Sequence, residues 1–393
     1  MVWLQIFAAF ARLGVTSFGG PVAHIGYFRD EFVTRRGWLD DRAYADLVAL
    51  CQVLPGPASS QVGMALGLHR GGWPGLLAAW VAFTLPSAVL LAAAAVGLAG
   101  LGGGAWQDGL VHGLKAAAVA VVAQAVWGMA RSLWPGRRHA AVGLLAAVAA
   151  LLVPGAWGQV AVIVLGGLAG WRLLPEAAVE AAPTLALPHG RRTGAVLLAL
   201  FVVLLVGLPL VAGGPDTASG LAAAFYRAGA LVFGGGHVVL PLLDSAVVPT
   251  GVVPADTFLA GYGLAQAVPG PLFTFAAYLG AAAGLPDAPW AWAALALGAI
   301  FLPAFLLVAG ALPFWSILAG VHGARAALAG VNAAVVGLLL AALYDPVFTA
   351  AVHGPADFAL VLTAGLLLMV ARWPAWAAVA AIGAVGAGFA VLA

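Results

Sequence analysis

The sequence predicts an all-α integral membrane protein, an inverted repeat of two homologous halves. Its composition, its apolar runs and a series of repeated motifs predict this fold. Of its 393 residues, 64% are hydrophobic and 8% are charged, whereas about a quarter of the residues in soluble domains are charged. Apolar runs such as 76–98 and 196–212 have the length of a membrane-spanning helix, about 17–25 residues. Because such runs occur throughout, we expect a multi-pass protein of the inner (cytoplasmic) membrane, surrounded by lipid.

Short motifs recur in the same order in both halves of the chain. They are a Phe-Gly-Gly, a Gln followed three residues later by Pro-Gly-Pro, and a Val-His-Gly. The matching segments are 18–20 with 233–235, 52–57 with 266–271, and 111–117 with 321–327. An ordered series of matches at nearly constant spacing indicates two copies of one module.

Each copy opens with apolar segments that glycine and proline interrupt. The first-copy segments are 3–17, 22–34, 43–54 and 58–68. Each is shorter than the roughly 20 residues that a spanning helix needs. Glycine permits a sharp turn, and proline suits the first turn of a new helix. We therefore expect four re-entrant helical hairpins, at the Gly-Gly and Pro-Gly-Pro breaks; continuous helices kinked at these points are the alternative.

Longer apolar helices follow these breaks. We expect them at 74–100, 107–131, 140–153 and 157–173 in the first copy, at 194–212 in the linker, and at 288–312, 316–343, 356–371 and 374–392 in the second copy. Together they predict about nine transmembrane helices.

The positions of Lys and Arg indicate how the copies are oriented, because these residues accumulate in short cytoplasmic loops. The loops at 29–42 and 131–138 are rich in arginine, whereas their counterparts at 244–256 and 344–357 contain neither Lys nor Arg. This reversal predicts an inverted repeat, as in many secondary transporters. We expect a first repeat at 1–175, a linker with one unpaired transmembrane helix at 176–218, and a second, inverted repeat at 219–393.

Four cations lie within apolar segments: Arg12, Lys115, Arg227 and Arg325. Each would cost about 2.5–3.5 kcal/mol at mid-bilayer if it faced lipid. We therefore expect them to face the protein interior or water and to have anionic partners. Structural salt bridges or snorkelling are the alternatives, whereas an anionic ligand is the simplest partner for Arg12 and Arg227. Asp41 and Asp256 precede helices, and we expect them to be N-caps.

The glycine breaks predict an anion site. Each break starts a new helix, whose free N–H groups and positive dipole end attract anions, and glycine lets a ligand approach the backbone closely. Inverted copies would bring four such breaks together near the midplane. The candidate ligand-binding glycines are Gly19, Gly20, Gly56, Gly234, Gly235 and Gly270.

Polar side chains beside the breaks complete the predicted site. Gln52 and Gln266 each precede a Pro-Gly-Pro by three residues, while Ser59 and Ser60 follow the first one. The glutamines either bind a ligand or hydrogen-bond to the interrupted backbone. His24 and His237 follow the glycine turns, where they could donate to a ligand, carry a proton or have a structural role.

No motif indicates an enzyme or a bound cofactor. The chain lacks HExxH, a P-loop and a Rossmann glycine pattern, and its single cysteine excludes sites built on paired thiolates. We therefore expect no catalytic residue, no metal site and no cofactor. The net charge of +2 arises mainly from short loops, so it indicates orientation rather than nucleic-acid binding.

With these residues identified, the sequence resembles the long, two-domain form of the chromate ion transporter family. The resemblance covers nearly the whole chain and rests on the segments 18–24, 52–57, 233–241, 266–271 and 344–346. It implies export of chromate from the cytoplasm, with sulfate as a competitor. A carrier of sulfate or another oxyanion and an anion channel of the same fold remain alternatives, and so does a homodimer.

Overall fold

The computed structural model describes residues 1–100, 104–153, 155–174, 187–233, 236–283, 287–315 and 323–392. Within these ranges the regular structure is helical and contains no strand, which confirms the all-α prediction. The candidate ligand-binding residues Gly234 and Gly235 lie outside the described residues.

The first copy opens with four helical segments separated by the expected breaks. They are α1 (Val2–Thr16), α2 (Gly20–Phe28) with its π-helical extension η1 (Arg29–Arg35), α3 (Asp41–Val53) and α4 (Ala58–Gly100). Gly19 has φ 97°, a left-handed conformation that favours glycine, and Pro21 lies in the first turn of α2. Helix α4 combines the segment predicted at 58–68 with the helix predicted at 74–100, and Gly72 interrupts it with φ 63° and ψ −155°.

The remaining helices of the first copy and the linker follow the apolar runs. They are α5 (Ala105–Leu133), α6 (Arg137–Leu152), α7 (Ala156–Leu173) and the linker helix α8 (Arg191–Val211). Helix α8 packs on α9 and α13, at the margin of the molecule.

The second copy has the same order of segments. They are α9 (Ala218–Leu231), η2 (Gly236–Val238), α10 (Val239–Val247), α11 (Ala255–Ala267), η3 (Leu272–Thr274), α12 (Phe275–Ala283), α13 (Pro289–Ala311), η4 (Leu312–Phe314), α15 (Ala324–Ala342), η5 (Leu343–Phe348), α16 (Pro355–Gly365), η6 (Leu366–Val370) and α17 (Ala375–Leu392).

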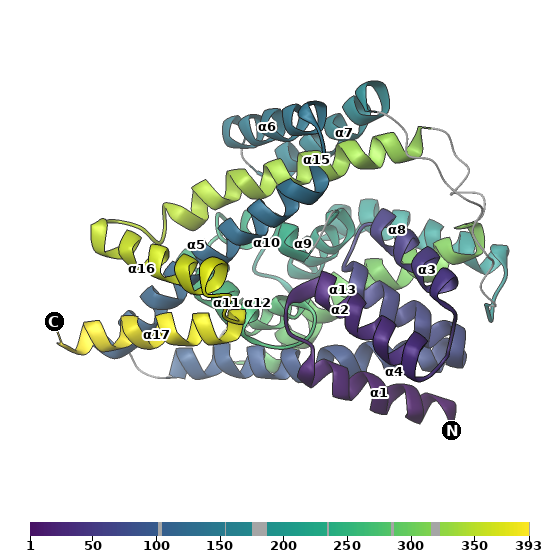
Figure 1. Ribbon diagram of the computed structural model, residues 1–393, viewed down its shortest axis with the longest axis horizontal. Helices are drawn as coiled ribbons and strands as arrows, with labels where there is room; N and C mark the ends of the chain where they lie inside the picture. Colours follow the sequence, from purple (N-terminus) through teal and green to yellow (C-terminus); the bar gives the residue numbers. More distant parts are fainter. Residues whose placement is uncertain are drawn as a thin grey trace.

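The two copies exchange their last helices. Helix α7 of the first copy packs along α15 of the second, and α17 of the second packs along α5 of the first (Figure 1). Glycines line both contacts: a Cβ on Gly170 would collide with α15, and one on Gly113 would collide with α17. Small residues allow such close approach between helices in membranes. Each copy therefore completes the helix bundle of the other.

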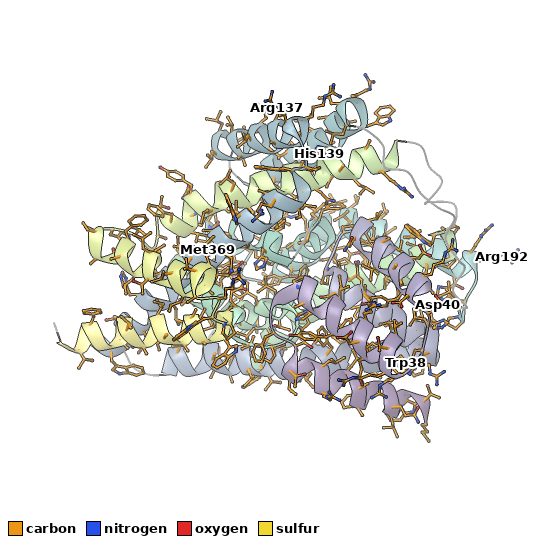
Figure 2. The ribbon with its side chains drawn as sticks, viewed as in Figure 1. Trp38, Asp40, Arg137, His139, Arg192 and Met369 are labelled. Carbon is orange, nitrogen blue, oxygen red and sulfur yellow. The ribbon has the colours of Figure 1, made fainter. Side chains whose placement is uncertain are left out.

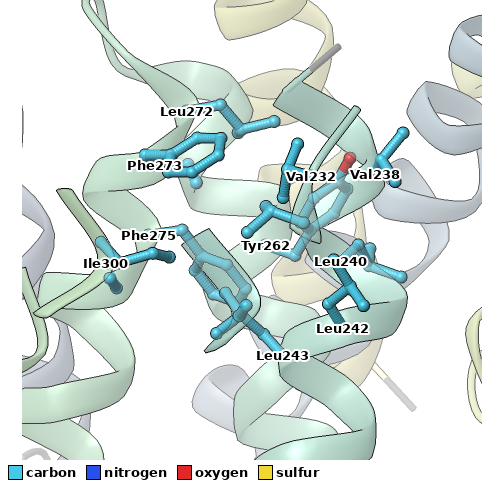
Figure 3. Close-up of a cluster of buried hydrophobic side chains, with 14 of the residues drawn as sticks. Val232, Val238, Leu240, Leu242, Leu243, Tyr262, Leu272, Phe273, Phe275 and Ile300 are labelled. Atoms are coloured by element: carbon cyan, nitrogen blue, oxygen red, sulfur yellow. The ribbon is translucent and has the colours of Figure 1, made fainter. Parts of the chain in front are cut away.

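The hydrophobic core packs directly against the breaks. In the second copy, large apolar side chains of α10, α11, η3, α12 and α13 interlock there, as Figure 3 shows for Leu243, Tyr262, Phe273, Phe275 and Ile300. This packing fixes the positions of the loops that carry the candidate site.

Within the part of the chain that the structure describes, five helical segments are long and apolar enough to cross a membrane: Ala58–Gly100, Ala105–Leu133, Arg191–Val211, Pro289–Phe314 and Arg325–Phe348. The other apolar helices, among them α7 and α17, are shorter. The structure thus agrees with a multi-pass membrane protein, whereas the count of about nine spans and the re-entrant path of the hairpins stay predictions.

Candidate functional site

The breaks of the two copies are joined by a reciprocal pair of backbone hydrogen bonds. The N–H of Gly56, in the first Pro-Gly-Pro, donates to the carbonyl oxygen of Val232 at 2.7 Å. The N–H of Gly270, in the second Pro-Gly-Pro, donates to the carbonyl oxygen of Ser17 at 2.9 Å. Ser17 and Val232 are equivalent, because each precedes a Phe-Gly-Gly. The fold therefore brings the breaks of both copies to one place.

A cavity of about 370 Å³ lies between these breaks and the spanning helices. Its polar lining comes from Gly19, Gly20, Gln124, His237, Gln266 and Gly270, and Trp373 and Pro374 lie near its rim. Gln266 is half-buried beside Tyr262, and its Nε2 makes no hydrogen bond of 3.5 Å or less with the described residues. An unpaired buried donor costs free energy unless a ligand or water accepts from it.

A second cavity, of about 570 Å³, lies beside the first Pro-Gly-Pro. Gln52, Gly56, Ser132, Asn332 and His237 contribute to its lining. The Oδ1 of Asn332 is buried and has no partner among the described residues. Gly19, Pro21, Ala125 and His237 line both cavities, so the two spaces adjoin at the breaks.

The two histidines near the breaks differ in their surroundings. His24 is fully buried: its Nε2 lies 3.2 Å from the carbonyl oxygen of Ser17, and its Nδ1 lies 3.3 Å from the hydroxyl of Ser59. If the Nε2–H donates to Ser17, Nδ1 can accept from Ser59, so both nitrogens are satisfied. His237 instead lines both cavities, and its Nδ1 lies 3.0 Å from the hydroxyl of Tyr262.

Buried hydroxyl groups lie behind the first break. Ser59 and Ser60 belong to the first turn of α4 and are buried. The hydroxyls of Ser17 and Ser60 have no partner among the described residues. These serines are not among the residues that line the two cavities, so they belong to the supporting layer of the candidate site.

The cations do not gather at the breaks. Arg12 is exposed on α1, Arg227 is half-buried on α9, and neither lines the cavities. Arg325 lies in the first turn of α15, also away from them. On α1 the buried face is formed by Ile6, Ala9, Phe10 and Leu13, so Arg12 projects away from this face.

Lys115 forms a salt bridge, and the two predicted N-caps do not cap their helices. Lys115 is buried and forms a 2.6 Å ion pair with Asp256, which satisfies its charge, as in the salt-bridge alternative. Asp256 therefore is not an N-cap, and Pro254 precedes α11 in that position. The prediction for Asp41 was also wrong: Asp40 caps α3 by accepting from the N–H of Ala43, and Asp41 pairs with Arg29.

Several lining residues were not singled out from the sequence, among them Gln124, Asn332 and Trp373. Gln124 and Asn332 are amides within the apolar helices α5 and α15. Polar residues in such helices usually face the bundle interior, so this signal was available. Trp373 carries no comparable signal, because tryptophan is common at membrane interfaces.

The chemistry of the lining suits an anion rather than a cation. Backbone N–H groups, amides and an imidazole surround the two cavities, and none of the described lining residues is Asp or Glu. Nor do the described residues contain a group of three His, Cys, Asp or Glu side chains that could hold a metal ion.

Comparison with known proteins identifies the family. The family model described as chromate transporter matches the chain twice, at residues 4–171 and 219–387, in agreement with two homologous halves. A chromate transport protein of Pseudomonas aeruginosa is 31% identical, and the match covers 94% of this chain and 86% of the relative.

Two further relatives match over a similar length. A chromate transport protein of Cupriavidus metallidurans is 28% identical, over 93% of this chain and 87% of the relative. A probable chromate transport protein of Synechococcus elongatus is 27% identical, over 94% and 89%. No solved structure matches. The family consists of transporters rather than enzymes, and this chain belongs to the chromate transporter family.

Proposed function

We propose that this chain is a secondary transporter that exports chromate, or a similar tetrahedral oxyanion, across the cytoplasmic membrane. The observation that carries the proposal is the pair of adjoining cavities at the joined breaks, lined by amide and imidazole side chains and by no described carboxylate. The names of the relatives support chromate as the substrate.

Neutral donors are the proposed ligands of the anion. The Nε2 of Gln266 makes no described hydrogen bond, and His237 and the Gly19–Gly20 backbone adjoin it in the first cavity. Hydrogen bonds to a charged group contribute about 1.5–3 kcal/mol each. Arg12, Arg227, Lys115 and Arg325 lie outside the two cavities, and the proposed site does not include them.

Both cavities lie near the same end of α5. On α5 their lining residues lie within 121–133, whereas Lys115, which is paired with Asp256, lies nearer the N-terminal end. On α11, Asp256 lies in the first turn and Gln266 in the last. The Lys115–Asp256 ion pair thus links α5 and α11 at one end, and the smaller cavity lies between their other ends.

We infer that this arrangement is the inward-facing state of an alternating-access cycle. Arg131 lies in the last turn of α5, and Arg137 begins α6 just after it; arginines accumulate in cytoplasmic loops. Rocking of the copies about the joined breaks would then expose the anion to the other side. Outward movement of two negative charges across about 100 mV, inside negative, releases about 4.6 kcal/mol, at about 2.3 per charge.

Replacement of one donor tests the proposed site. Gln266→Leu keeps most of the side-chain volume but removes the amide, so we expect the apparent KM for chromate to rise roughly 10- to 100-fold, because a hydrogen bond to a charged group is lost. The measurement is uptake of labelled chromate by inverted membrane vesicles. Gln5→Leu, an exposed change on α1, is the control.

The outcomes separate the alternatives. Unchanged kinetics in Gln266→Leu would remove the cavity from the transport path. If excess sulfate is transported in preference to chromate, the chain is a sulfate carrier. If flux fails to saturate with concentration and shows no counterflow, it is an anion channel.

A further inference from the structure

We propose that the groove between α6 and α7 binds an anionic glycerophospholipid of the cytoplasmic leaflet. The groove has a volume of about 660 Å³ and is separate from the two central cavities. Its walls are almost entirely apolar, apart from Arg138 and Arg172. Nothing in this proposal depends on which anion the protein transports.

The two arginines lie at the same end of the groove. Helices α6 and α7 are consecutive, with Arg138 in the first turn of α6 and Arg172 in the last turn of α7. Arg138 Nη1 donates to the carbonyl oxygen of Leu173 at 3.0 Å, which ties the two helix ends together. Figure 2 shows the neighbouring Arg137 at the outer edge of the molecule. One end of the groove is therefore cationic and the rest is apolar, as a lipid requires.

The length of the groove matches one lipid leaflet. Its lining extends on α6 from Arg138 to Ala149 and on α7 from Arg172 back to Val162. At 1.5 Å per residue these walls measure about 15–16 Å, and half of a hydrocarbon layer of about 30 Å is about 15 Å. An acyl chain can thus lie along the groove while its headgroup reaches the arginines.

The walls of the groove are open to lipid. Leu145 and Leu165 on its rim are 69% and 62% exposed. Beside its cationic end, the Arg172 guanidinium lies 5.0 Å from the centroid of the Trp171 ring, and tryptophan is enriched at the headgroup level of membranes. The groove therefore faces the bilayer, with its arginines at the interface.

The charges favour an anionic lipid over a zwitterionic one. The sequence contains no Asp or Glu from residue 109 to residue 175, and within the described residues neither arginine has a carboxylate partner. Arg325 is the only charged residue of α15, which packs against both helices. Guanidinium groups bind phosphate oxygens in a bidentate manner, while a choline headgroup would place its ammonium beside these cations.

Lipid binding to the purified, delipidated full chain tests the proposal. Phosphatidylglycerol and phosphatidylcholine with identical acyl chains are titrated, and bound lipid is counted by native mass spectrometry. We expect the wild type to prefer phosphatidylglycerol. Arg138→Gln with Arg172→Gln should weaken phosphatidylglycerol binding roughly 30-fold, at about fivefold per basic residue, and weaken phosphatidylcholine binding less, because choline offsets the charge of its phosphate.

A matched control removes two arginines that lie outside the groove. Arg191→Gln with Arg192→Gln alters two arginines at the start of α8 and should keep the preference. Ala169→Phe narrows the groove without a change of charge and should weaken binding of both lipids. Should the glutamine variant fail to fold, Arg138→Lys with Arg172→Lys provides the comparison: it should keep the preference but bind less tightly.

Three results would overturn the proposal, and the first two concern the lipid preference. One is equal binding of the two lipids by the wild type. Another is an equal loss of phosphatidylglycerol binding in the Arg138→Gln, Arg172→Gln variant and in the Arg191→Gln, Arg192→Gln control. Displacement of the bound lipid by excess inorganic phosphate alone would also contradict it, since a phosphate ion has no acyl chain to fill the groove.

Discussion

At the scale of single residues, the glycines of the Pro-Gly-Pro breaks combine a left-handed backbone with close packing. Gly56 has φ 119° and Gly270 has φ 89°. A Cβ on Gly270 would lie 3.0 Å from the hydroxyl oxygen of Ser87 and 3.2 Å from the carbonyl oxygen of Phe83. Gly270 also donates the hydrogen bond to Ser17, so a side chain here would disturb the joined breaks directly.

Gly270→Ala should therefore impair both stability and transport. The left-handed backbone alone costs roughly 1–2 kcal/mol for a residue with a Cβ, and the contacts with Ser87 and Phe83 would shift the loop. We expect the thermal unfolding midpoint to fall and chromate uptake to drop at least tenfold. Both are measured on the same vesicle preparation.

Gly251→Ala separates backbone strain from the disturbance of the breaks. Gly251 has φ 74°, but a Cβ there would meet nothing within 4 Å. This variant should lose similar backbone stability and keep wild-type transport. If both variants transport equally well, the joined breaks are not part of the transport path.

The sequence predicted the identity of the break residues better than the role of the cations. Gln266, Gly270 and His237 were recognised because they accompany motifs that recur, and all three line a cavity. Arg12 was selected because a cation in an apolar segment is costly, yet this argument does not specify which face of α1 carries it. The partner of Lys115 lies 141 positions away, beyond what local patterns reveal.

At the scale of helices, glycine-lined crossings hold the exchanged helices together. On α15, Gly330 contacts Gly166 and Gly170 of α7 so closely that a Cβ would collide with their backbone. Gly365 of α16 is also helical, but a Cβ there would meet nothing within 4 Å. The two positions thus share a backbone conformation and differ in packing.

Substitution by alanine should have opposite effects at these two positions. Gly330→Ala overpacks the α7–α15 contact and should destabilise the protein by about 1–3 kcal/mol. Gly365→Ala adds helix propensity at no steric cost and should stabilise it by about 0.5–1 kcal/mol. Thermal unfolding of the detergent-solubilised protein measures both, and a gain in stability for Gly330→Ala would contradict the packing described here.

Most helix boundaries were predictable because apolar runs and helix-breaking residues coincide. The helix expected at 374–392 is α17 (Ala375–Leu392), and the one expected at 157–173 is α7 (Ala156–Leu173). The joining of two expected segments in α4 was missed, because Gly72 changes the direction of the chain without a loop. The π-helical turn η1 has no signal in composition or periodicity.

At the scale of the whole molecule, the exchange of helices determines where the cavities form. The sequence predicted two related halves, but repetition alone does not reveal whether each half packs on itself. In the structure α5 contacts α11, α16 and α17 of the other half, and both cavities lie between α5 and the breaks. Residues of both halves therefore line the cavities.

Efflux of labelled chromate from proteoliposomes under an imposed voltage tests the central claim most directly. The account predicts saturable efflux that accelerates when the chromate-containing side is made negative, without any pH gradient, because the carried anion has two charges. Efflux that is absent, or that rises linearly with chromate concentration, would contradict a carrier with a binding site at the joined breaks.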